Sequence, residues 1–306
     1  MARNGAIAVI AKCPMAGKSK TRLIPLLGEQ GSAALARAML SDVLTSLSRC
    51  EELKPAKKIL FYAPPTQQGL EIMREILISL SLYSQPHQEW VLLPMVSVSL
   101  ASSDLGDQLT DALVRARQVQ VEEHHTANAL PGPVIFLGMD APELPLGELV
   151  SAFEHPDTAL LCPSDDGGYG MLSVPATADA DSIFDGIRWS DPLTAVAQLK
   201  NLTDGGVPVR IGQLMHDMDE PDDVLNLCAR LRIHHLQDSS LLPSLPNNAK
   251  ANAAPSVDSK YVSKPDILMQ PSSLLQKREI CLGRSMECSC HYTKQILVKC
   301  AVMVVC

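Results

Sequence analysis

The chain has 306 residues, of which 46% are hydrophobic and 20% are charged, and its formal net charge is −8. A globular chain of this length can bury a large core, so it needs no disulfides for stability. The acidic balance argues against a nucleic-acid-binding protein, because such proteins usually carry a basic face. No apolar run approaches the ~20 residues that cross a bilayer, so we expect no membrane partner either.

Nine cysteines divide into two groups along the chain. Four are widely and unevenly spaced, which is typical of reduced thiols in the cytoplasm: Cys13, Cys50, Cys162 and Cys228. The other five lie in the last 26 residues: Cys281, Cys288, Cys290, Cys300 and Cys306. The apolar run at residues 5–11 is short, ends at Lys12 and lacks the cleavage site of a signal peptide. We therefore expect a cytoplasmic protein.

Short apolar runs alternate with longer amphipathic stretches over most of the chain. The runs predict β-strands at residues 6–11, 58–62, 90–94, 134–138, 158–162 and 207–211. The amphipathic stretches predict helices at residues 32–48, 66–80, 107–117, 145–153, 191–201 and 220–231. In the first of these helices, apolar side chains recur every four residues from Leu35 to Leu47. Regular alternation of strands and helices predicts an α/β domain with a mostly parallel sheet.

The alternation stops near residue 236, which divides the chain into a domain, residues 1–236, and a low-order tail, residues 237–306. The tail carries eight basic and five acidic residues, so the domain alone has a charge of −11. The tail contains ten serines and five prolines, and we expect residues 237–280 to be a disordered linker.

The end of the tail is rich in cysteine and apolar residues. Cys288 and Cys290 are separated by one residue, whereas paired ligands in structural zinc fingers usually have about two to four between them. This spacing argues against a zinc site. The apolar segments at residues 296–298 and 301–305 are long enough for one edge strand but too short for a membrane anchor.

The loop after the first predicted strand carries four cations within an acidic domain: Lys12, Lys18, Lys20 and Arg22. In a doubly wound sheet this loop lies at the carboxyl edge, where ligands bind. Gly17 lets the backbone approach an anion, so the loop suits a nucleotide di- or triphosphate. Two alternatives are a solvated basic loop and a P-loop at residues 17–19. A P-loop would need glycine at the position of Lys12.

Acidic residues follow two other predicted strands. Asp140 comes directly after the strand at residues 134–138, where it would suit Mg²⁺ or Mn²⁺. It could instead cap the next helix. Asp217 and Asp219 are two residues apart and could share one side of a metal site. The alternative for Asp219 is a cap on the helix that opens at residues 220–221.

A third acidic segment contains Asp165 and Asp166 before the glycine pair Gly167 and Gly168. Paired glycines let the backbone pass close to a ligand, but Asp-Gly is also typical of a hairpin turn. The residues alone leave both interpretations open.

These segments, in order, match the motifs of one known family. Its pattern Ala-Lys-x-Pro-x-x-Gly-x-x-Lys-Thr-Arg-Leu matches residues 11–23, and Gly-x-Asp-x-Pro-x-Leu matches residues 138–144. Its Asp-Gly-Gly-Tyr, Trp-Ser and Asp-x-Asp motifs match residues 166–169, 189–190 and 217–219. Two departures are Ser103, which replaces the first glycine of Gly-Asp-Leu-Gly, and Gly170, where a bulkier residue is usual. The chain thus resembles the rSAM/selenodomain-associated transferase family 1, within the nucleotide-diphospho-sugar transferase superfamily of GT-A type.

The resemblance covers roughly residues 6–230 and implies a single three-layer, Rossmann-like domain of GT-A type. It implies a metal-dependent, glycosyltransferase-like enzyme that uses a nucleotide-sugar donor and a small-molecule acceptor. Related superfamily members include guanylyltransferases, so nucleotidyl transfer from a nucleoside triphosphate is an alternative. A non-catalytic nucleotide-binding protein of the same fold is another.

The resemblance also implies roles for individual residues. Phosphate binding falls to Lys12, Gly17, Lys18, Lys20 and Arg22. The implied ligands of Mg²⁺ or Mn²⁺ are Asp140 and Asp219, and the implied catalytic residues are Asp140 and Asp166. The implied substrate pocket consists of Asp104, Gly167, Gly168, Tyr169 and Trp189.

Overall fold

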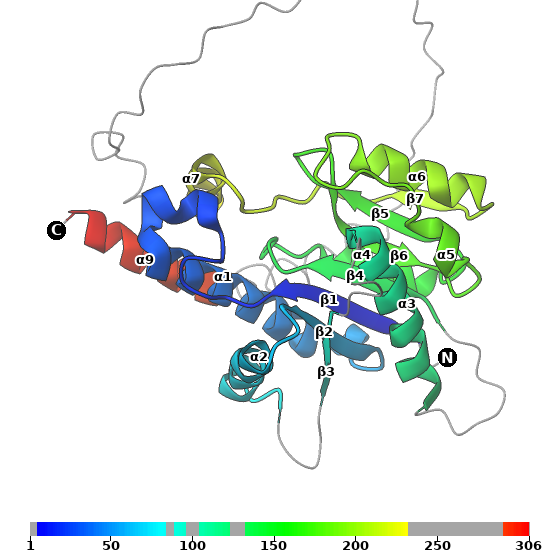
Figure 1. Ribbon diagram of the computed structural model, residues 1–306, viewed down its shortest axis with the longest axis horizontal. Helices are drawn as coiled ribbons and strands as arrows, with labels where there is room; N and C mark the ends of the chain where they lie inside the picture. The colour runs from blue at the N-terminus through cyan, green and yellow to red at the C-terminus, as the bar shows by residue number, and fades with distance from the viewer. Residues whose placement is uncertain (1–4, 84–88, 96–103, 123–131, 232–289, 306) are drawn as a thin grey trace, which may run out of the picture.

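A computed structural model describes residues 5–83, 89–95, 104–122, 132–231 and 290–305 (Figure 1). Seven strands of these residues form one sheet, in the order β3-β2-β1-β4-β6-β5-β7. The strands are β1 (Ala6–Lys12), β2 (Lys57–Ala63), β3 (Trp90–Pro94), β4 (Val134–Gly138), β5 (Ala159–Pro163), β6 (Tyr169–Val174) and β7 (Val209–Ile211). Only β6 runs antiparallel to its neighbours, β4 and β5. The predicted α/β fold with a mostly parallel sheet is confirmed.

Helices cover both faces of the sheet. The longer helices are α1 (Ile24–Arg49), α2 (Gln67–Ser79), α3 (Leu105–Glu122), α4 (Leu146–Glu154), α6 (Thr194–Asp204), α7 (Pro221–Arg230) and α9 (His291–Val305). Short helical segments are η1 (Thr21–Leu23), η2 (Glu51–Leu53) and α5 (Ala180–Ile183). One face of the sheet packs against α1, α2 and α4, and the other packs against α3, α5 and α6. These three layers are the predicted architecture.

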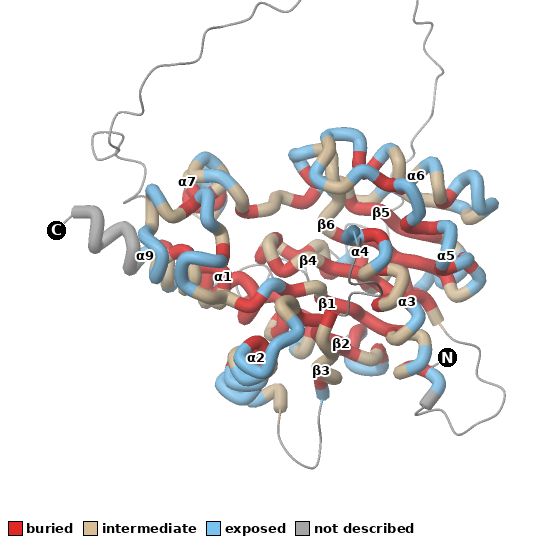
Figure 2. The backbone as a smooth tube through the Cα atoms, viewed as in Figure 1, coloured by how far each residue is buried: buried red, intermediate tan, exposed pale blue. Residues whose placement is uncertain are grey.

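The continuously apolar central strands explain this layering. In β4, Ile135 and Leu137 enter the core under α1, whereas Val134 and Phe136 enter the core under α3. Because side chains alternate between the two faces of a strand, a strand covered on both sides is apolar at nearly every position. Figure 2 shows the resulting band of buried residues along the centre of the sheet.

The first predicted helix, residues 32–48, lies within the longer α1. Helix α1 begins eight residues earlier, at Ile24, and Gly28, at φ 69° and ψ 170°, interrupts the helical conformation in this first part. Strand β6 was not predicted. It pairs with β5 through a turn at residues 164–168, so the hairpin interpretation of the Asp-Gly segment is correct for the backbone.

The end of the chain differs from its prediction. Residues 296–298 and 301–305 belong to α9, so the expected edge strand is wrong. Helix α9 lies along α1 (Figure 1). The fully buried Leu297 of α9 joins a small hydrophobic cluster with Leu23 of η1, residues of α1 and α7, and Met218. The end of the chain is rich in β-branched residues, which favour strands. It forms a helix because it packs against α1, and the local sequence does not reveal this packing.

Several expectations lie outside the described residues. They are the disordered linker at residues 237–280, the departure at Ser103, and the cysteines Cys281, Cys288 and Cys306. No disulfide joins the four scattered cysteines of the domain, as predicted. Burial raises the pKa of the Cys13 thiol to about 11. In the described part of the chain, none of the helices is both long and apolar enough to cross a bilayer.

Candidate functional site

The basic loop between β1 and η1 is folded on itself by a buried serine. Ser19, which is 3% exposed, donates a hydrogen bond to the Cys13 carbonyl (2.9 Å) and accepts one from the Met15 N–H (2.8 Å). The N–H groups of Lys18 and Ser19 both donate to the Met15 carbonyl, at 3.1 and 3.0 Å. Gly17 occupies a left-handed conformation at φ 71°, which this tight turn requires. Because its hydroxyl closes the loop, Ser19 does not serve as the metal-binding serine of a P-loop.

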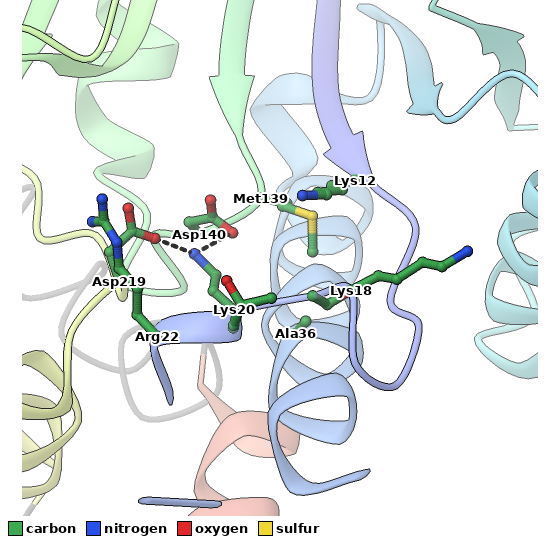
Figure 3. Close-up of a pocket in the computed structure, with 10 residues that line it drawn as sticks. Lys12, Lys18, Lys20, Arg22, Ala36, Met139, Asp140 and Asp219 are labelled. Carbon is green, nitrogen blue, oxygen red and sulfur yellow. Dashed lines mark hydrogen bonds and ion pairs between the residues drawn. The ribbon is translucent and has the colours of Figure 1, made fainter. Parts of the chain in front are cut away.

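Lys20 connects the basic loop to both predicted metal ligands. Its Nζ lies 2.7 Å from Asp219 Oδ1 and 2.9 Å from Asp140 Oδ1. Lys20 has a left-handed backbone (φ 48°), an uncommon conformation for a side chain of this size. This conformation is held by an ion pair on each side, and it directs the ammonium toward the ends of β4 and the segment before α7 (Figure 3).

The electrostatic balance at Lys20 favours its charged form. Burial of this side chain, which is 8% exposed, would lower its pKa, but the charges and hydrogen bonds of Asp140 and Asp219 outweigh burial and raise it. The two carboxylates are themselves partly open, at 40% and 46% exposure. The three groups therefore form a fixed charge cluster with one side facing solvent.

A cavity of about 210 Å³ opens beside this cluster. Its lining comprises Lys12, Lys18, Ser19, Lys20, Thr21, Arg22, Ala36, Met139, Asp140 and Asp219. Pockets that enclose a drug-sized ligand measure about 300–1,000 Å³, so this cavity matches the phosphate end of a nucleotide rather than the whole molecule. In Figure 3, Lys18 extends away from the Lys20 ammonium, which leaves cations on two sides of the cavity.

The alternative capping roles of Asp140 and Asp219 are not realised. Helix α4 begins at Leu146 with Pro145 as its N-cap, well beyond Asp140. The N-cap of α7 is Glu220, which forms a capping box with Asp223. Both aspartate side chains are therefore available to a ligand at the carboxyl edge of the sheet.

Asp140 and Asp219 are the two predicted ligands of a metal ion. Two carboxylate oxygens, from Asp140 and Asp219, converge on one positive charge, that of Lys20. Among the described residues, no group of three or more His, Cys, Asp or Glu side chains could hold a metal ion. Mg²⁺ is often bound by one or two carboxylates together with substrate phosphates. The residues thus fit a metal ion that is bound jointly with a nucleotide, with Lys20 shifted toward the phosphates.

Arg22 and Glu220 form an exposed pair at the rim of the cavity. Arg22 Nη1 lies 3.0 Å from Glu220 Oε1, and the side chains are 66% and 54% exposed. Exposed ion pairs of this kind contribute about 0–1 kcal/mol. Arg22 can therefore exchange this partner for a phosphate at little cost.

Asp166 has a local structural role within the β5–β6 turn. Its Oδ1 accepts hydrogen bonds from Ser164 Oγ (2.6 Å) and from the Gly168 N–H (2.9 Å). Gly167 lies against Pro192 with φ 87°, so close that a Cβ atom would lie 2.1 Å from the Pro192 carbonyl oxygen. Asp166, Gly167 and Gly168 do not line the cavity, and a catalytic role for Asp166 stays a prediction.

The remaining residues of the expected substrate pocket form a separate group. Asp104 Oδ1 accepts from the Asp107 N–H (3.0 Å) in the first turn of α3. The rings of Tyr169 and Trp189 meet edge to face at a centroid distance of 6.5 Å. The Tyr169 hydroxyl donates to Gln198 Oε1 (2.9 Å), and burial raises its pKa. These contacts explain local order, and the assignment of this group to a substrate stays a prediction.

The departure at Gly170 has a packing explanation. A Cβ atom there would lie 2.8 Å from the Met215 Sδ and Cε atoms. Met215 thus occupies the space of the bulkier residue that the family pattern has at this position.

A histidine and an aspartate form a pair at the carboxyl edge of the sheet, and the sequence did not predict this pairing. His216 Nδ1 is 2.6 Å from Asp165 Oδ2, because a parallel bridge between Ser164 and Met215 brings the two segments together. The next residue, Asp217, is half-buried, and burial raises its pKa to about 6, with Asp166 and Asp219 adding to the effect. The sequence signal for this pair was the position of His216, directly before the Asp217-x-Asp219 motif.

The chain is similar in fold to solved structures of other proteins. A protein from Desulfovibrio desulfuricans G20, described as a candidate nucleotide-diphospho-sugar transferase, has a similar crystal structure, with a TM-score of 0.60 and 22% sequence identity. The similarity covers 78% of this chain and 90% of that one. The two chains therefore share their fold.

More distant similarities involve nucleotidyltransferases. The 4-diphosphocytidyl-2C-methyl-D-erythritol synthase of Anaerococcus prevotii DSM 20548 has a TM-score of 0.44 at 12% identity, covering 76% of this chain and 98% of its own. A cytidylyltransferase of Leptospira borgpetersenii has a TM-score of 0.43 at 11% identity, covering 74% and 87%. The model of a family described as "Uncharacterized protein conserved in bacteria (DUF2064)" matches residues 46–191. No curated protein matches the sequence.

Proposed function

We propose that this protein is a metal-dependent transferase that takes a sugar from a nucleotide-sugar donor. The observation that carries the proposal is the position of Lys20, whose ammonium lies between Asp140 and Asp219 in a cavity lined by further cations. Such a cavity accepts the anionic diphosphate of a donor, while its two carboxylates accept a divalent cation.

The cations of the cavity have distinct tasks. Lys12 and Arg22 lie on its rim, where they can bind the donor phosphates and orient the donor. Lys20 lines the same cavity, so when a metal ion takes its place between the two carboxylates, its ammonium can pair with the donor phosphates and stabilise charge on the leaving diphosphate. Neutralising that same charge is the chemistry that Mg²⁺ or Mn²⁺, held by Asp140 and Asp219, would supply.

The pairing of His216 with Asp165 supports a hydroxyl acceptor. In the tautomer with its proton on Nδ1, His216 donates to Asp165 Oδ2 and Nε2 can accept a proton. In the transfer, the acceptor oxygen bonds to the sugar carbon, the bond from this carbon to the diphosphate oxygen breaks, and the hydroxyl proton passes to His216. A phosphate acceptor is already ionised and needs no such base, so the pair favours glycosyl over nucleotidyl transfer.

Product analysis tests the proposal. The protein is incubated with Mn²⁺, panels of nucleotide-sugars and nucleoside triphosphates, and small acceptors that carry hydroxyl or phosphate groups. Sugar transfer releases a nucleoside diphosphate, and nucleotidyl transfer releases pyrophosphate. We expect the diphosphate, with turnover about 10²-fold lower in Asp140→Asn and in Arg22→Ala.

Three results would contradict the proposal. Pyrophosphate as the product would establish nucleotidyl transfer. Nucleotide binding without turnover on every donor and acceptor would indicate a non-catalytic protein. Full activity of Asp140→Asn without metal would overturn the metal-dependent mechanism.

A further inference from the structure

A small hydrophobic cluster lies beneath the candidate site and is separate from the two cores of the sheet. Its buried members are Leu23, Leu35, Met39, Met218, Val224, Leu227, Cys228 and Leu297. Two of them belong to the segments that form the cavity. Leu23 directly follows Arg22, and Met218 directly precedes Asp219, and both are fully buried.

These two cavity segments have little regular structure of their own. Lys20 and Arg22 lie in a loop and a three-residue helix, and Asp219 lies between the end of β7 and the start of α7. Short segments of this kind depend on side-chain anchors for their position. Leu23 and Met218 are such anchors, and they meet in the same cluster. The Lys20–Asp219 ion pair joins the two segments directly above it.

Helix α9 is tied to the domain by a buried carboxylate. Asp42 of α1 is 1% exposed, and its two oxygens accept hydrogen bonds from the N–H groups of Tyr292 (2.8 Å) and Thr293 (2.7 Å). The first N–H groups of a helix have no partner within the helix, so Asp42 acts as an N-cap supplied by another helix. This contact fixes the start of α9, and about one turn after Thr293 the side chain of Leu297 enters the cluster.

We propose that α9 is an integral part of the candidate site, with Leu297 and Asp42 as positioning residues for the segments that carry Lys20, Arg22 and Asp219. Leu297 packs in the cluster that also contains Leu23 and Met218, and Asp42 fixes the start of its helix. The inference rests on the proposed function only for what the cavity binds. The mechanical link between α9 and the two segments is independent of it.

Hydrogen exchange and anion binding on the full-length protein test the link. In Leu297→Ala, we expect exchange at residues 20–24 and 215–220 to become about tenfold faster or more, while β1 and β4 keep their wild-type rates. Binding of inorganic tripolyphosphate with Mg²⁺ should weaken about tenfold, because the cations are no longer held in place. Val298→Ala is the matched control, since this neighbouring side chain is 38% exposed. It should leave both measurements unchanged.

Two further variants separate positioning from general stability. Leu77→Ala removes a fully buried side chain from the core under α2, so it should lower stability but leave tripolyphosphate affinity unchanged. Asp42→Asn keeps the shape of the side chain and weakens only the cap. It should change the exchange rates and the tripolyphosphate affinity in the same direction as Leu297→Ala, but by less. If Leu297→Ala does not fold, Asp42→Asn takes its place in the test.

One result would overturn the inference. Faster exchange in α9 itself, with wild-type rates at residues 20–24 and 215–220, would show that α9 is an appendage. If the wild-type protein does not bind tripolyphosphate, the proposed function fails, but the exchange experiment still decides whether α9 positions these segments.

Discussion

Lys20 and Asp219 are 199 residues apart in the chain, yet Lys20 Nζ and Asp219 Oδ1 are joined by a hydrogen-bonded ion pair of 2.7 Å. This pair connects the loop after β1 with the segment before α7. Asp140 is the second partner of Lys20. The two ion pairs together hold the cationic loop next to the two carboxylates of the cavity.

Replacing Lys20 by methionine keeps the length of the side chain and removes its charge. We expect tripolyphosphate affinity to fall about 10- to 100-fold, because a hydrogen bond to a charged group contributes about 1.5–3 kcal/mol. Asp140 and Asp219 would then face one another without a cation, so Mn²⁺ should raise the melting temperature of Lys20→Met more than that of the wild type. Lys200→Met is the matched control, since Lys200 pairs with Asp204 on the exposed surface of α6. Equal Mn²⁺ shifts in all three proteins would contradict the carboxylate pair as a cation site.

Ser19→Ala tests the fold of the basic loop. The buried hydroxyl satisfies one carbonyl and one N–H group of the loop, so its loss should lower the free energy of unfolding by about 1–3 kcal/mol. Urea denaturation measures the change. Ser182→Ala, which removes an exposed hydroxyl with one local bond to the Asp179 carbonyl, should cost far less. A similar small loss in both variants would mean that Ser19 does not hold the loop.

Gly167→Ala tests the close approach of the β5–β6 turn to Pro192. A Cβ atom would clash with the Pro192 carbonyl at 2.1 Å, and φ is 87°. We expect a loss of about 3 kcal/mol, from backbone strain and overpacking together. Gly186 has a similar φ of 64° but nothing within 4 Å of its Cβ position, so Gly186→Ala should lose only about 1 kcal/mol. Thermal unfolding of both variants measures the part of the stability loss that comes from the contact with Pro192. Equal losses of stability in the two variants would show that this contact contributes nothing.

Asp42 should make stability depend on pH. Burial raises its pKa to about 6, although the hydrogen bonds from Thr293 and Tyr292 and the charge of His291 act in the opposite direction. A carboxyl group whose pKa is raised in the folded state binds more protons there than when unfolded. Its contribution to the free energy of unfolding therefore falls as pH rises from about 4 to about 6, by about 3 kcal/mol at most.

The Asp42→Asn variant lacks this titration. Compared with the wild type, its free energy of unfolding should increase across the same pH interval. Denaturation with urea at pH 4.5, 5.5 and 7 measures the difference between the two proteins. A difference that stays constant over this interval would show that Asp42 titrates in its usual range.

Much of the fold follows from patterns that act locally. Short apolar runs predicted six of the seven strands, and several of these runs are continuously apolar because a strand covered on both faces buries nearly every side chain. Strand β6 was missed since its residues follow a glycine pair and read as a loop. Helix α9 was missed for another reason, because Asp42 and the cluster around Leu297 stabilise it from outside its own sequence.

The candidate site was predictable to a similar degree. Parallel strands end at one edge of a sheet, and this rule predicted that the basic loop and the acidic residues lie together. The structure places them in one cavity, which is lined by Lys12, Lys20, Arg22, Asp140 and Asp219. The rule cannot determine which side chains pair across that edge. The position of Lys20 between two carboxylates, the use of Asp166 within its own turn and the pairing of His216 with Asp165 all depend on three-dimensional contacts.

The most direct measurement is calorimetric titration of the full-length protein with nucleotide-sugars and nucleoside triphosphates, each with and without Mn²⁺. The proposed function predicts that a nucleotide-sugar binds, that Mn²⁺ strengthens its binding, and that Lys20→Met and Asp140→Asn each weaken it about tenfold or more. Absence of binding by any nucleotide, or binding that neither Mn²⁺ nor these substitutions change, would contradict it.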